Sequence, residues 1–118
     1  MRLAGIVDKG WGWEDIWATT DKYCGKMLHF KEGKMFSMHF HKEKDETWYV
    51  IEGRFVVKFI DTKDATVHEK MLSTGDIWHN PPLLPHQLIC LEEGMICEVS
   101  TADSVEDNYR VMPGDSQK

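Results

Sequence analysis

Two histidines and a glutamate lie close together in the stretch that follows Gly33. His39 and His41 are two residues apart, so on a β-strand both imidazoles leave the same face. The polar segment 42–45 is expected to reverse the chain and bring Glu46, the first residue of the next strand, alongside them. Imidazole and carboxylate ligands together suit a divalent transition metal such as Zn, Fe, Mn, Ni or Cu better than Ca or Mg.

A fourth metal ligand has to come from farther along the chain, and His86 is the natural candidate. It opens an apolar strand directly after segment 80–85, whose prolines hold the approach extended. The alternative is that the closely spaced histidines are exposed polar residues on a solvated strand. Met35 and Trp48 argue against that alternative, because they share the proposed inward faces, where polar groups need partners.

Glu98 and His79 are the candidates for moving a proton. Glu98 lies in the predicted strand 95–100, and if its face points inward it becomes a pocket carboxylate with a raised pKa and a candidate base. The alternative is a solvated strand carboxylate. His79 either lines the pocket mouth as an acid–base group or is an exposed turn histidine. His29 and His68 lack a donor at a useful spacing and are expected to be structural.

Short β-strands are the elements that must position these residues. Turn signals, among them segments 52–53 and 92–94, recur about every 8–12 residues, as in antiparallel sandwiches and barrels. Both faces of several strands are apolar, which favours two packed sheets or a closed barrel. A helix is indicated only weakly, at 104–110, before a polar tail at 111–118. Period-two alternation and branched residues predict strands at 46–51, 54–60, 66–72, 87–91 and 95–100.

Composition and charge limit the partners. The chain has 118 residues and a formal net charge of −6, which argues against capture of nucleic acid or an anionic membrane. No apolar run approaches the roughly 20 residues of a membrane span, and the start at 1–5 lacks the apolar core of a signal peptide. Cys24, Cys90 and Cys97 cannot all pair. Reduced thiols in a cytoplasmic, single-domain protein (1–118) are therefore expected.

Two spaced patterns frame the metal-ligand candidates. The first is Gly33-x5-His39-x-His41-x4-Glu46-x6-Gly53, and it resembles the complete first motif of the cupin superfamily. The second is Gly75-x5-Pro81 followed by His86, and it is similar to the second cupin motif. It departs from that motif at Leu83, where glycine is usual, and at Cys90, where asparagine is usual.

The cupin resemblance covers about residues 25–101. It implies an all-β, cupin-type double-stranded β-helix, a jelly-roll barrel, with an N-terminal strand extension and a short C-terminal helix or tail. It also implies one divalent transition metal (Zn, Fe, Mn or Ni) per chain, bound by His39, His41, Glu46 and His86.

Further segments give a narrower resemblance. Residues 9–12, 37–48, 98–100 and 106–110 are similar, in order, to the cupin domain of type II mannose-6-phosphate isomerases. That family commonly has glutamine where His39 stands, arginine where Lys44 stands, and an extra glycine before the arginine at 110. Lysine lacks the planar fork that lets arginine bind a phosphate or sugar oxygen pair.

Three functions remain open on the sequence. The first is a metal-dependent isomerase or epimerase for a small sugar or sugar phosphate, with Glu98 or His79 moving the proton. The second is an Fe- or Ni-dependent oxygenase, because four protein ligands leave two octahedral positions open. The third is a metal-bearing module that binds a small ligand without turnover.

The N-terminal tryptophans bear on assembly. Trp11, Trp13 and Trp17 form either a stacking platform for a carbohydrate or, by preference, a dimer seam or a cover of the barrel. Open edge strands in a small sandwich favour pairing with a second copy. The sequence therefore predicts a homodimer with these tryptophans in the interface.

Overall fold

Antiparallel β-strands make up most of the part of the chain that the computed structural model describes, residues 5–118. Residues 1–4, which belong to the segment expected to carry no signal peptide, lie outside it. No helix within the described part is long and apolar enough to cross a bilayer. The strands are β1 Ile6–Lys9, β2 Gly12–Thr19, β3 Tyr23–Phe30, β4 Met38–Phe40, β5 Glu46–Asp61, β6 Thr66–Ser73, β7 Ile77–Asn80, β8 His86–Thr101 and β9 Tyr109–Met112, followed by a 3₁₀ helix at Asp115–Gln117.

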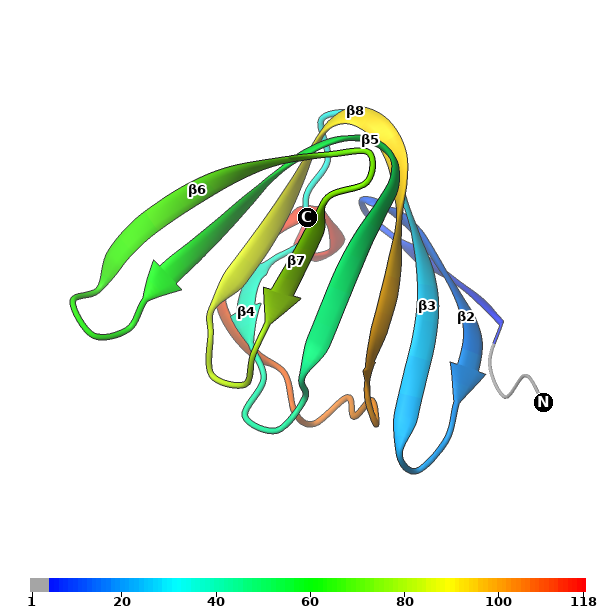
Figure 1. Ribbon diagram of the computed structural model, residues 1–118, viewed down its shortest axis with the longest axis horizontal. Helices are drawn as coiled ribbons and strands as arrows, with labels where there is room; N and C mark the ends of the chain where they lie inside the picture. Colours follow the sequence, from blue (N-terminus) through cyan, green and yellow to red (C-terminus); the bar gives the residue numbers. More distant parts are fainter. Residues whose placement is uncertain (1–4) are drawn as a thin grey trace.

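The strands curl into the predicted jelly roll. One path of hydrogen-bonded neighbours runs β1-β2-β3-β8-β4-β9, and β5 joins it by pairing with β8, β6 and β7. Figure 1 shows the resulting arch, with β5 and β8 crossing its top and the hairpin of β5 and β6 extending to one side. The all-β, jelly-roll prediction is confirmed.

The two longest strands continue through positions predicted as turns. β5 runs through segment 52–53 and β8 through 92–94, with shifts in their mutual register between Val50 and Phe55. Gly53 has φ +93°, and a Cβ on it would lie 2.7 Å from the Cα of Gly94. Facing glycines thus let both strands bend sharply without separating, because neither carries a side chain at the point of closest approach.

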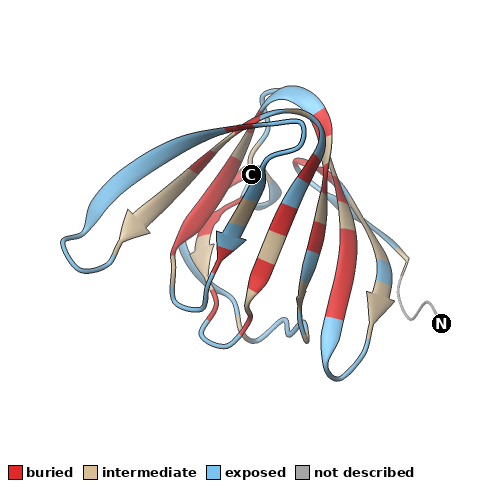
Figure 2. Ribbon diagram, in the orientation of Figure 1, coloured by how far each residue is buried: buried red, intermediate tan, exposed pale blue. Residues whose placement is uncertain are grey.

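This bend also changes which residues of β5 face inward. Trp48 and Val50 are buried before it, and Phe55 and Val57 are buried after it, so the inward set moves from even to odd positions. Figure 2 shows bands of buried residues on β3, β5 and β8, while β6 is exposed over most of its length and the outer end of β5 is of intermediate burial. The core is made of Trp11, Leu28, Phe30, Phe36, Trp48, Val50, Phe55, Val57, Leu72, Leu88, Cys90 and Ile96.

The C-terminal segment is better ordered than the sequence indicates. The weak helix prediction at 104–110 is wrong, because this segment consists of bends that lead into β9. β9 pairs with β4, and the carboxylate of Asp115 accepts a hydrogen bond of 2.7 Å from the backbone N–H of Met35. These long-range contacts favour an extended chain over an isolated two-turn helix, which is marginal by itself. Within the described residues, the only helix of the tail is the short 3₁₀ turn at Asp115–Gln117.

Leu83 adopts a backbone conformation that favours glycine. Its φ is 73°, its side chain is 57% exposed, and its N–H donates to the carbonyl of His41 at 2.7 Å. The left-handed region costs a non-glycine residue about 1–2 kcal/mol, and the greater freedom of unfolded glycine offsets part of that. We expect Leu83→Gly to raise the free energy of unfolding by about 0.5–1 kcal/mol in urea titrations. A loss of stability would show that the Leu83 side chain contributes more than the strain costs.

Candidate metal centre and cavity

Three histidines converge on the inner surface of the arch. His39 lies on β4, His41 follows the end of β4, and His86 begins β8. His39 and His86 are opposite each other in the antiparallel pair of β4 and β8. One ring nitrogen from each of the three lies within 4.8 Å of the others. The structure therefore brings together the three histidines that the spacing predicts.

The three imidazoles are held with the same nitrogen facing inward. Nδ1 of His39 lies 2.9 Å from the carbonyl oxygen of Ser37, and Nδ1 of His86 lies 2.9 Å from that of Leu84. Nδ1 of His41 contacts the carbonyl oxygen of Asp107. A carbonyl oxygen can only accept, so Nδ1 carries the proton in each ring. The Nε2 lone pairs are left free for a metal, as in metal-bound histidines.

Glu46, the fourth predicted ligand, lies beside His86 at the start of β5. It is buried, and its Oε1 lies 3.0 Å from Nε2 of His86. That nitrogen is also buried and has no hydrogen-bond donor or acceptor in suitable geometry. Two acceptors at this distance repel each other unless a proton or a metal ion is shared between them. Three imidazoles and a carboxylate fit Zn, Fe, Mn or Ni.

Electrostatics keep these groups in their metal-binding forms. Burial lowers the pKa of His39 to about 3, and its histidine neighbours His86 and His41 act in the same direction. Burial also lowers the pKa of His41. Burial opposes ionisation of Glu46, but contacts with His86 and Lys44 hold its pKa well below the usual range. Neutral imidazoles and an ionised carboxylate are the forms that coordinate metals.

His39, His41 and Glu46 form part of the wall of a cavity of about 350 Å³, whereas the buried His86 does not line it. Its volume is at the small end of the range for ligand sites, which suits a molecule about the size of a monosaccharide. Apolar side chains, including Trp11, Phe36 and Trp48, alternate in its wall with charged and polar ones. The stack of Trp11 on Phe30, with ring centroids 4.3 Å apart, makes Trp11 a cover of the barrel.

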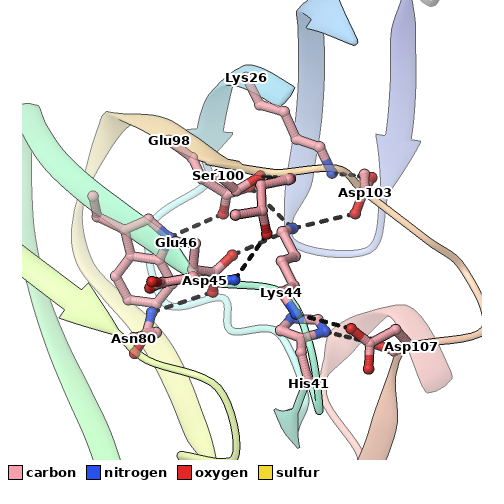
Figure 3. A network of polar contacts seen from close by, with 12 residues as sticks. Lys26, His41, Lys44, Asp45, Glu46, Asn80, Glu98, Ser100, Asp103 and Asp107 are labelled. Carbon is pink, nitrogen blue, oxygen red and sulfur yellow. Dashed lines mark hydrogen bonds and ion pairs between the residues drawn. The ribbon is translucent and has the colours of Figure 1, made fainter. Parts of the chain in front are cut away.

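Glu98 lies inside this cavity, as the inward-facing alternative predicts. The indole N–H of Trp48 donates to its Oε1 at 3.0 Å, and Nζ of Lys44 lies 3.3 Å from its Oε2. Burial, and next the charge of Glu46, raises the pKa of Glu98 to about 7, although Lys44 and Lys26 lower it. Figure 3 shows this carboxylate among the side chains of the polar network.

The other proton-transfer candidate lies outside the cavity. His79 is on β7 opposite Thr47, with its ring exposed and Nε2 in contact with Oδ1 of Asp45. Its neighbours Trp78 and Asn80 are paired with the inward residues of β5, so strand alternation turns His79 outward. The cavity wall therefore includes Glu98 and not His79.

The remaining histidines have structural contacts. His29 is stacked with Trp13 at 4.4 Å between ring centroids, and His68 is stacked with Phe59 at 5.4 Å. Neither belongs to the metal-ligand group found among the described residues.

Several residues of the site carry no clear signal in the sequence. Lys26 and Asp103 form an ion pair of 2.9 Å, and Lys44 lies 3.2 Å from the same aspartate. Asp107 accepts hydrogen bonds from the backbone N–H groups of residues 42–44, which fixes the turn between His41 and Glu46. One signal for Lys26 exists, because it is a charge in the otherwise apolar inward row of β3.

Comparisons with known proteins agree with this geometry. Residues 26–102 match the family described as Cupin domain. Oxalate decarboxylase OxdC from Bacillus subtilis (strain 168) is 35% identical over 68 residues, which are 57% of this chain and 17% of that protein. The chain therefore spans about a sixth of this relative.

Two solved structures share the fold. A structure of oxalate decarboxylase from Bacillus subtilis at pH 4.6 superposes with a TM-score of 0.78 and 23% identity, covering 92% of this chain and 30% of that one. KdgF from Halomonas sp. superposes with a TM-score of 0.69 and 21% identity, covering 80% of this chain and 81% of that one. At these sequence identities, the superpositions show a shared fold and nothing more.

Proposed function

The chain belongs to the cupin family, and from that premise we propose that it is a metal-dependent isomerase or epimerase for a small sugar or sugar phosphate. Residues 1–118 form one cupin domain in this proposal. One divalent metal (Zn, Fe, Mn or Ni) is held by His39, His41, Glu46 and His86. The position of Glu98 carries the proposal, because it places a buried carboxylate in the same cavity as the histidine group.

The chemistry requires a base beside an activated carbonyl. A bound divalent metal would polarise a carbonyl oxygen and its neighbouring hydroxyl, and so stabilise an enediolate. Glu98 would then accept the proton from the hydroxyl-bearing carbon next to the carbonyl. In an isomerase it returns this proton to the former carbonyl carbon while the hydroxyl proton passes to the other oxygen, and in an epimerase it returns the proton to the other face of the same carbon after the enediolate has turned over. Trp48 and Lys44 hold the two oxygens of Glu98 in place.

Solvent proton exchange tests this function without knowledge of the product. Aldoses, ketoses and their phosphates are incubated in deuterated water with the protein and the metal it carries when isolated. Loss of the C2–H signal by NMR supports an isomerase or epimerase. Absence of exchange with every compound contradicts it.

The oxygenase and the ligand-binding module are the alternatives if no exchange occurs. His39, His41 and Glu46 line the cavity, which would leave coordination positions of a bound metal open to a substrate and O₂. Oxygen uptake by the iron-loaded protein would select the oxygenase. Ligand binding without oxygen uptake or exchange would select the module.

We also propose that two copies of the chain pair in a reducing cytoplasm. Cys24, Cys90 and Cys97 are free thiols. The outer sheet face has an uncharged row in which Thr47 of β5 pairs with Val99 of β8, and Val99 with Gly25 of β3. Val99 is 50% exposed, and exposed Trp17 packs over Gly25. A flat apolar face of this kind suits an isologous interface with a second copy.

Sedimentation tests the dimer. The unmodified protein is expected to sediment as a dimer at tens of micromolar (roughly the range in which standard interfaces persist). Val99→Lys is expected to convert it to a monomer, because a charge on each copy would be buried in the interface. The matched control is Val67→Lys on the β5–β6 hairpin, where Val67 is 61% exposed. A monomeric unmodified protein, or a dimeric Val99→Lys variant, would contradict this interface.

A further inference from the structure

The charges that line the cavity are unevenly paired. Its carboxylates are Glu14, Glu46, Glu98 and Asp103. Lys44 lies within 3.3 Å of an oxygen from each of the last three of these. Lys26 lies 3.5 Å from Glu14 and 2.9 Å from Asp103. Two buried lysines therefore contact all four carboxylates of the cavity, and Figure 3 shows most of this network.

Arg110 lines the same cavity and has no partner among the described residues. No hydrogen bond or ion pair is formed by its guanidinium within residues 5–118. The other arginine of this part of the chain, Arg54, lies outside the cavity and pairs with Glu92 at 3.3 Å. Lys9 is a second cation of the cavity wall that has no ion-pair partner among the described residues.

The register of β4 and β9 places Arg110 beside the candidate metal centre. Arg110 is the partner of His39 in the antiparallel pair of these strands. Side chains of directly opposite residues leave the same face of a sheet, about 5 Å apart at their Cβ atoms. The guanidinium thus extends from the wall that carries His39, and a ligand can contact both groups at once.

Arg110 is exposed on the open side of the cavity, and without a partner among residues 5–118 its guanidinium is available to an anion. Its planar fork binds the oxygens of a carboxylate or phosphate in pairs, which makes these contacts strong and directional. The chain as a whole carries a net charge of −6 and repels anions at long range. Selectivity for an anionic ligand therefore has to come from local cations such as Arg110 and Lys9.

We propose that Arg110 binds an anionic group, carboxylate or phosphate, on the ligand of this cavity, while the oxygens at the ligand's other end face the histidine group. The inference rests on the proposed sugar-directed function and narrows it to sugar acids or sugar phosphates. Arg110 contacts the ligand and is not a metal ligand. Its loss should change ligand affinity and leave metal content intact.

Tryptophan fluorescence gives a binding readout that needs no turnover, because Trp11 and Trp48 line the cavity. The metal-bearing protein as isolated is titrated with glucuronate and mannose 6-phosphate, and with their uncharged parents glucose and mannose. Glucuronate and mannose 6-phosphate separate the carboxylate from the phosphate. The variants are Arg110→Gln and Arg110→Lys, and Arg54→Gln is the matched control because Arg54 is a surface arginine.

The unmodified protein and Arg54→Gln are expected to bind at least one anionic probe about 10- to 100-fold more tightly than its uncharged parent, the effect of one charged, paired hydrogen bond. Arg110→Gln should remove that difference, and Arg110→Lys should restore part of it. Metal content measured on the same samples should be equal in all of them.

Equal binding of anionic and uncharged probes by the unmodified protein would overturn the proposal. So would undiminished preference for the anion in Arg110→Gln, or no binding of any probe. These outcomes are separate from those of the exchange assay. Anion preference without proton exchange would remove the isomerase and leave the Arg110 site standing. Proton exchange without anion preference would support the isomerase and remove the Arg110 site.

Discussion

Replacing Glu98 by Gln is expected to slow exchange of the substrate C2 proton by about 10²–10⁴-fold, the usual contribution of a positioned general base. The substitution keeps the shape of the side chain and an oxygen that can accept from the indole of Trp48. It removes the group that takes up the proton. The measurement is the initial rate of deuterium incorporation at saturating substrate, so that a change in affinity does not obscure it.

Metal content separates this effect from damage to the site. Glu98 is not one of the four proposed ligands, so Glu98→Gln should retain the metal of the unmodified protein. Glu69→Gln is the matched control, because Glu69 is an exposed acid on β6 whose partner is Lys58 at 3.6 Å. It should exchange at the unmodified rate. Undiminished exchange by Glu98→Gln would mean that another group of the cavity is the base.

Replacing His86 or His39 by Ala is expected to weaken metal binding by at least about 10²-fold. Each substitution removes one of four proposed ligands, and even the loss of an outer hydrogen-bonding partner of a ligand commonly costs 10–100-fold. No neighbouring donor can take the place of His86, since its ring is buried between β4 and β5. Competition with a chromophoric chelator measures the affinity.

Removal of a histidine outside the site provides the control. His68→Ala alters a ring that is stacked on Phe59 at the outer hairpin, and its metal affinity should equal that of the unmodified protein. Circular dichroism identifies any variant that fails to fold. An affinity in His86→Ala equal to that in His68→Ala would rule out His86 as a ligand.

Much of the candidate centre is predictable because it depends on local geometry. Residues that are two apart on a strand lie on the same face, and this is enough to place His39 beside His41. The proline-rich approach places His86 at the start of a strand, opposite His39. Period-two alternation also offers the inward position of Glu98 as one of two alternatives. These predictions need only the direction of side chains along a strand.

The rest depends on contacts between distant parts of the chain. The pairing of β9 with β4 brings Arg110 to His39, and segment 104–110 alone indicates a weak helix. The ion pairs of Asp103 require a loop to fold back over β3. The bend of β5 and β8 depends on two glycines facing each other, so each appears in the sequence as an isolated turn signal. Strand alternation excludes His79 from the cavity only once its pairing with Thr47 is known.

Every function proposed for this cavity depends on whether the protein holds one divalent metal per chain. The protein is purified without chelator and without added metal, and its metals are quantified by elemental analysis beside the double variant His39→Ala, His86→Ala. We expect about one equivalent of Zn, Fe, Mn or Ni per chain in the unmodified protein and almost none in the double variant. A metal-free unmodified protein that also fails to take up any of these ions, or a fully loaded double variant, would contradict it.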